Sequence, residues 1–90
     1  MGAIYDLVIT VKDQKGSCAL GHRVGDRFYV RKGASPSGLC MTAMAALIPA
    51  VSVLMVGGSF PWEDDPDSCC RTCQDRQNPV TFEIRRLASS

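Results

Sequence analysis

The sequence predicts an α+β protein in which a small three-stranded antiparallel sheet packs on one long apolar helix, in the order β-β-α-β. Three observations lead to this class. Two segments near the start and one near the end alternate apolar and polar residues, as strands with one buried face do. Residues 33–62 contain no charged side chain, and their apolar residues recur at helical spacing. Ninety residues fit one domain, so we expect a single domain over 1–90.

The three strands are predicted from alternation and from the turns around them. The first covers Ile4–Lys12, the second follows a turn at residues 24–26, and the third follows Asn78-Pro79. Residues 58–72 are interpreted as a long acidic connection without regular structure. The side chains expected to face the core are Tyr5, Leu7, Ile9, Val11, Phe28, Val30, Val80, Phe82 and Ile84.

The helix is expected to begin at Ser35-Pro36, because serine caps helices and proline suits the first helical position. It should run to about Val56 and stop at Gly57-Gly58. Pro49 removes one backbone hydrogen bond inside it, so we expect a kink or a break near Ile48.

Both sides of the predicted helix are apolar, which predicts burial all round. Three strands can cover only one side. We therefore expect a homodimer formed through the Leu39–Val56 helix. The first of these two sides carries Cys40, Met44, Leu47, Val51 and Leu54, and the second carries Ala43, Ala46 and Ala50.

Charge and cysteine usage narrow the class of protein. Ten Lys and Arg residues against nine Asp and Glu leave the chain near neutral, which argues against a nucleic-acid partner. The apolar run is at the short limit for a membrane span and contains Thr42, Pro49 and Ser52, so we expect a buried helix and no membrane partner. Five cysteines form an odd number, and no secretory signal is recognised in Met1–Asp6, so we expect reduced thiols in the cytoplasm.

Three groups of residues could carry chemistry. Cys18-x3-His22 offers a thiolate and an imidazole, which suit zinc or iron; the alternative is a buried cysteine beside a surface histidine. Cys70-x-x-Cys73, directly after Cys69, has the spacing of a zinc knuckle or a redox dithiol. The alternative is that these cysteines only line a loop and have no joint role. Cys40 lies in the first turns of the predicted helix, where the helix dipole lowers a thiol pKa.

Three stretches of the chain together resemble a family of small prokaryotic proteins of unknown function, common in anaerobes. They are G-S-C-A-L-G-H-R-V-G-D at 16–26, G-L-C at 38–40, and a late part with G-G-x-F-P-W at 57–62, C-x-D at 73–75 and N-P-V-x-F-E-I-R at 78–85. Cys18, His22, Cys40 and Cys73 match the family pattern. The sequence departs from it at Gln74, where the family has proline, and at the extra cysteines 69 and 70.

Three hypotheses on function remain. The first is a metal-binding module with one four-coordinate Cys3His site made by Cys18, His22, Cys40 and Cys73, structural or electron-carrying, holding zinc or, alternatively, an iron–sulfur cluster. The second is a thiol-dependent enzyme with Cys40 as nucleophile and His22 as base. The third is a non-catalytic interaction subunit that docks a larger enzyme.

Overall fold

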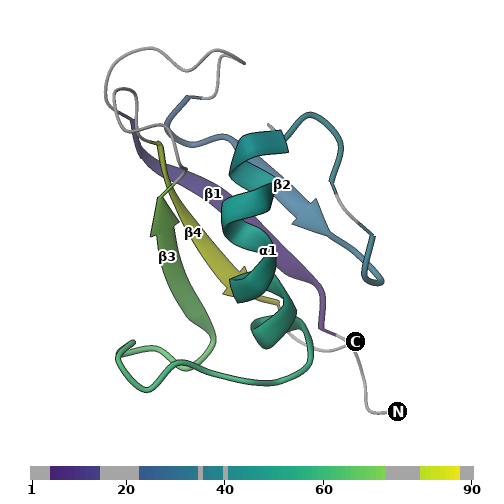
Figure 1. The fold of residues 1–90 in the computed structure, drawn as a ribbon, viewed down its shortest axis with the longest axis vertical. Helices are drawn as coiled ribbons and strands as arrows, with labels where there is room; N and C mark the ends of the chain where they lie inside the picture. The colour runs from purple at the N-terminus through teal and green to yellow at the C-terminus, as the bar shows by residue number, and fades with distance from the viewer. Residues whose placement is uncertain (1–4, 15–22, 35, 40, 73–79, 88–90) are drawn as a thin grey trace.

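The computed structural model describes residues 5–14, 23–34, 36–39, 41–72 and 80–87. These residues form four strands and one helix (Figure 1). In chain order they are β1 (Leu7–Gln14), β2 (Arg27–Val30), α1 (Met41–Met55), β3 (Ser68–Thr72) and β4 (Val80–Arg86).

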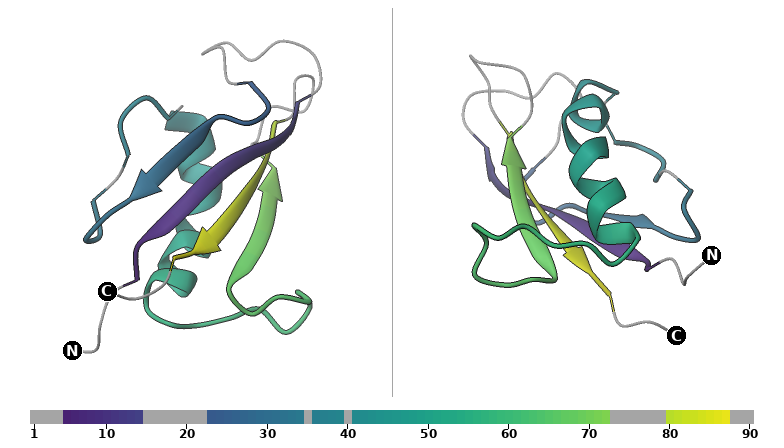
Figure 2. Two further views of the ribbon diagram at one scale, coloured as in Figure 1. Left: turned by 180° about the vertical axis from the view of Figure 1, so that it is seen from behind. Right: turned by 60° about the horizontal axis from the view of Figure 1, so that its bottom comes forward.

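The strands make one antiparallel sheet in the order β2-β1-β4-β3, and α1 covers one face of it (Figure 2). The predicted fold class, three strands on one long apolar helix in the order β-β-α-β, is therefore wrong. The described residues contain a fourth strand, β3, and the helix has 15 residues. β4 pairs with both β1 and β3, which places the last strand of the chain in the middle of the sheet.

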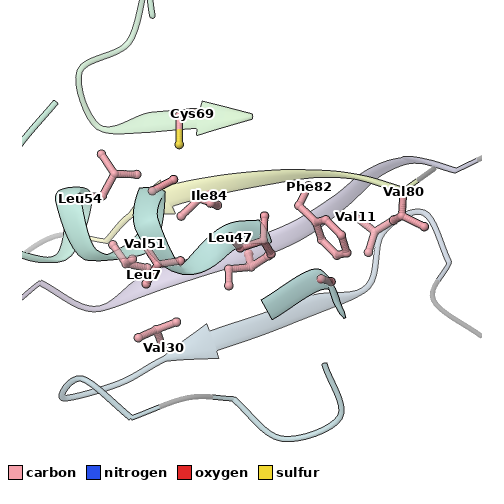
Figure 3. Close-up of a cluster of buried hydrophobic side chains, with 13 residues drawn as sticks. Leu7, Val11, Val30, Leu47, Val51, Leu54, Cys69, Val80, Phe82 and Ile84 are labelled. Atoms are coloured by element: carbon pink, nitrogen blue, oxygen red, sulfur yellow. The ribbon is translucent and has the colours of Figure 1, made fainter. Parts of the chain in front are cut away.

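The predicted inward faces of three strands are confirmed. Alternate side chains of β1 and β4 are fully buried, Val30 of β2 is buried, and Tyr5 and Phe28 pack against this core as partly buried residues. Helix α1 completes the core from the other side (Figure 3). The buried side chains of the sheet and helix are Leu7, Ile9, Val11, Val30, Ala43, Leu47, Ala50, Val51, Leu54, Cys69, Val80, Phe82 and Ile84.

Strand β3 lies in the region that the sequence predicts to be irregular. Of its five residues only Cys69 is buried, where its sulfur points into the same cluster as Leu54 and Ile84 (Figure 3). A buried cysteine behaves as a small apolar side chain. The strand follows a turn in which Asp65 accepts hydrogen bonds from the backbone N–H groups of Asp67 (2.9 Å, to its carboxylate) and Ser68 (3.2 Å, to its carbonyl).

The helix begins later than predicted. Gly38 has a φ of +83°, a conformation that a right-handed helix does not contain, so the chain cannot be helical from Pro36 onwards. α1 then runs through Pro49 without a break. Its end is as predicted: Gly57, with a φ of +90°, donates to the carbonyl of Leu54 (3.2 Å), and Gly58 donates to that of Val53 (2.8 Å). These two bonds satisfy carbonyls that the last helical turn leaves free.

The two sides of α1 differ from the prediction. The alanine side does not face away from the sheet, because Ala43 and Ala50 are 1% and 3% exposed and belong to the core with Leu47. The solvent-facing side instead carries Met41 and Ile48, which are 85% and 49% exposed. The helix is buried on one side only within a single chain.

Arg86 ties the end of α1 to the end of β4. Its guanidinium donates to the carbonyl oxygens of Leu54 (2.9 Å), Gly58 (2.7 Å) and Pro66 (3.0 Å). Two further bonds, of 2.7 and 3.1 Å, reach the carboxylate of Asp67. All five N–H groups of the guanidinium are thus used. The side chain is only 9% exposed, so this cation holds together three segments that are distant in the sequence.

Candidate functional site

The four predicted ligands, Cys18, His22, Cys40 and Cys73, lie outside the described residues. The structure does describe the residues on which their segments are anchored. His22, Cys40 and Cys73 are each the direct neighbour of a described residue: Arg23, Met41 and Thr72 respectively. The positions of these described neighbours show where in the fold each ligand-bearing segment is attached.

Two of the segments are anchored at the same end of the sheet, on the strands β1 and β3 that flank β4. Gln14, the last residue of β1, pairs with Val80, the first residue of β4. Thr72, the last residue of β3, pairs with Thr81, and their hydroxyl oxygens are 3.4 Å apart. Since neighbouring strands lie about 4.8 Å apart, the ends of β1 and β3 on either side of β4 are separated by roughly 10 Å.

A tight turn fixes the point at which the chain returns after residues 15–22. The carboxylate of Asp26 accepts a hydrogen bond from the N–H of Arg23 (2.9 Å), and the N–H of Asp26 donates to the carbonyl of Arg23 (3.0 Å). Val11 of β1 donates to the carbonyl of Asp26 (2.9 Å) and accepts from the N–H of Gly25 (2.8 Å). Gly25 has a φ of +96°, which explains the glycine in this motif. The turn therefore holds Arg23 close to β1.

The third anchor is the first turn of α1. Figures 1 and 2 show that it lies at the end of the molecule where β1 and β3 finish and β4 begins. The first turn contains no acidic side chain, so the partial positive charge of the helix end is not neutralised from within α1. All three segments that carry the predicted ligands are thus attached at one end of the fold.

The two cysteines that the structure describes have different surroundings. Cys69 is buried in the core, and Cys70, the next residue of β3, is exposed on the opposite face of the sheet. Desolvation of the sulfur raises the pKa of both thiols, and for Cys70 the carboxylate of Glu83, which pairs with it from β4, raises the pKa further. Both groups are therefore protonated at neutral pH, which does not favour a nucleophilic or metal-binding role for either.

The acidic connection before β3 does not form a cation site in the described part of the chain. The backbone N–H of Asp67 and the guanidinium of Arg85 hold the pKa of Asp65 below its ordinary value. Over the ranges that the structure describes, no three His, Cys, Asp or Glu side chains gather as a metal would need. Three carboxylates of this connection are instead paired with arginines: Glu63 with Arg71 at 3.8 Å, Asp65 with Arg85 at 2.7 Å, and Asp67 with Arg86 at 2.7 Å.

Sequence reasoning did not single out Arg71, Arg85 or Arg86, because their partners come from residues that the sequence does not place beside them. Within the described residues, no helix is long and apolar enough to cross a membrane. No family model, no curated protein and no solved structure matches the chain. The family resemblance therefore stays a prediction.

Proposed function

We propose that the chain is a small metal-binding module in which Cys18, His22, Cys40 and Cys73 bind one zinc ion. Three thiolates and one imidazole are the donors of a closed, four-coordinate structural zinc site. The observation that carries the proposal is the common attachment of the three ligand-bearing segments at one end of the sheet and helix.

The lengths of the segments allow the ligands to meet. Cys18 follows Gln14 by four residues, which span up to about 13 Å when extended, and the end of β3 lies roughly 10 Å from Gln14. Each of the other three ligands is one residue away from an anchor. The segments that carry Cys18 and Cys73 are therefore long enough to bring these two ligands together without rearrangement of β1, β3 and β4.

A metal bound at this end would also stabilise the folded chain. Ninety residues bury only about 60–65% of their unfolded surface, and small domains often depend on a metal for stability. The contacts described at this end include two strand pairs and one hydrogen-bonded turn. Binding free energy of an ion held by residues from three segments would add directly to folding free energy.

The test compares metal content in five single variants of the full chain. Cys18→Ser, His22→Gln, Cys40→Ser and Cys73→Ser each remove one proposed ligand, whereas Cys70→Ser changes an exposed cysteine on the outer face of β3. After anaerobic purification, we expect one zinc per chain in the wild type and the Cys70 variant. The four ligand variants should lose most of the metal and melt at a lower temperature, because metal binding and folding are coupled.

The result also separates zinc from the alternatives. Visible absorption and acid-labile sulfide in the purified protein would show an iron–sulfur cluster in place of zinc. If the wild type took up no metal, or if the four ligand variants bound it as well as Cys70→Ser, the proposal would be wrong. A thiol enzyme would then be supported if Cys40→Ser kept the wild-type melting temperature and lost only alkylation by iodoacetamide.

A further inference from the structure

The solvent-facing side of α1 carries an apolar seam. Met41, Ala45, Ile48 and Ser52 are exposed and Met55 is half-buried. These five residues follow one another at intervals of four, three, four and three, which is the repeat of helices that pack side by side. The seam lies on the side of α1 opposite the sheet, and four of its five residues are exposed to solvent.

A shallow apolar groove runs beside the seam, between α1 and β2. It has a volume of about 190 Å³, and its lining includes Val30, Met44, Ile48, Val51 and Met55. Large side chains on one edge of the seam and small ones on the other give the ridge-and-groove surface on which a second helix packs.

We propose that this seam binds a second copy of the chain, with the two α1 helices antiparallel around a two-fold axis at Ile48. In that arrangement Ile48 of one copy meets Ile48 of the other. Met41 and Met55 lie seven residues before and after Ile48 and therefore face each other across the axis. The small Ala45 and Ser52 lie three and four residues from Ile48, within one residue of the same level, so the seam is nearly complementary to itself. A two-fold interface requires this property, because the same patch contributes both sides.

The charges of the chain favour a second copy over another partner. No charged residue occurs from Gly33 to Trp62, so a copy of α1 brings no charge that the contact would leave unpaired. An antiparallel pair also places the positive end of each helix dipole beside the negative end of the other. A membrane surface is less well matched, because α1 lacks the Lys and Arg residues that interfacial helices present to lipid headgroups.

The test is the mass of the full chain in solution, measured by sedimentation and light scattering over a range of concentrations. We expect twice the 9.7 kDa of one chain for the wild type. Ile48→Lys and Ile48→Asp should each give the mass of one chain, because each places two like charges at the axis. Tyr29→Lys is the matched control: this residue is 39% exposed on the far face of the sheet, and its variant should stay dimeric.

Mixing the two Ile48 variants shows whether the axis is correctly placed. Opposite charges then meet at the axis, so the mixture should regain the doubled mass that neither variant forms alone. Unchanged circular dichroism of the separate variants shows that both are folded. A wild type that stays at 9.7 kDa into the millimolar range would overturn the proposal, as would a mixture that stays monomeric.

Discussion

Replacing Arg86 by lysine tests whether the guanidinium, and not merely a positive charge, holds the fold together. Lysine keeps the charge but offers three donors on a single nitrogen in place of five in a planar fork. It can keep a bond to Asp67 and reach one carbonyl oxygen, whereas Leu54, Gly58 and Pro66 all receive a bond from Arg86. At least two hydrogen bonds are lost.

The expected loss of stability follows from those contacts. Each lost bond is worth about 1 kcal/mol net, and the guanidinium lies 5.1 Å from the centre of the Tyr5 ring, a contact worth about 0.5–1 kcal/mol. The sum is about 2–3 kcal/mol. For a domain of this size, each kcal/mol lowers the melting temperature by about 4–8 °C, so Arg86→Lys should melt roughly 10–20 °C below the wild type.

Arg85→Lys is the control, since it makes the same change one residue earlier. Arg85 is 43% exposed and pairs with Asp65 at 2.7 Å on the outer face of the sheet. An exposed ion pair contributes at most about 1 kcal/mol, so this variant should melt close to the wild type. The assay is thermal and urea unfolding of both variants. Equal melting temperatures for the two variants would refute the role assigned to the guanidinium of Arg86.

Two further predictions concern the loop between α1 and β3. The pKa of Asp65 is below its ordinary 3.8, so its contribution to stability is present above that pH and is lost as the pH falls through the lowered value. Asp65→Asn should therefore be less stable than the wild type at pH 6, by a margin that shrinks below pH 3.8; a margin independent of pH would contradict this. A Cβ atom on Gly58 would lie 2.7 Å from Cγ1 of Val53, so Gly58→Ala should destabilise by about 1–2 kcal/mol in urea unfolding. Ser59→Ala, at the exposed next position, should change stability by less than about 0.5 kcal/mol, and equal effects would exclude the steric explanation.

The parts of the fold that could be predicted are those encoded locally. The alternation in β1 and β4 determines which side chains are buried, because successive residues of a strand point to opposite faces. The glycine pair at 57 and 58 likewise ends α1 through bonds to the preceding turn. Strand β3 could not be predicted in this way, since only Cys69 of its five residues is buried and its pairing with β4 depends on a distant segment.

The helix start shows how one local signal can outweigh another. Ser35-Pro36 is typical of a helix N-terminus, but Gly38, two residues later, adopts a left-handed conformation and delays the helix to Met41. For the candidate site, the sequence predicts which residues could act as donors, whereas the common attachment of their segments depends on strand order. That order depends on β1 pairing with β4, which no short stretch of sequence specifies.

The central position of β4 has a consequence for how the chain folds during synthesis. Gln14 pairs with Val80 although sixty-six positions separate them, and among the described strands β3 pairs only with β4. When β3 leaves the ribosome, its partner β4 still lies behind it in the exit tunnel, and β1 can pair only with the four residues of β2. Contacts between distant segments slow folding because the intervening chain must first be closed into a loop. The sheet therefore assembles only after translation of its last strand, and Cys69 and the inner side of α1 stay exposed on the nascent chain until then.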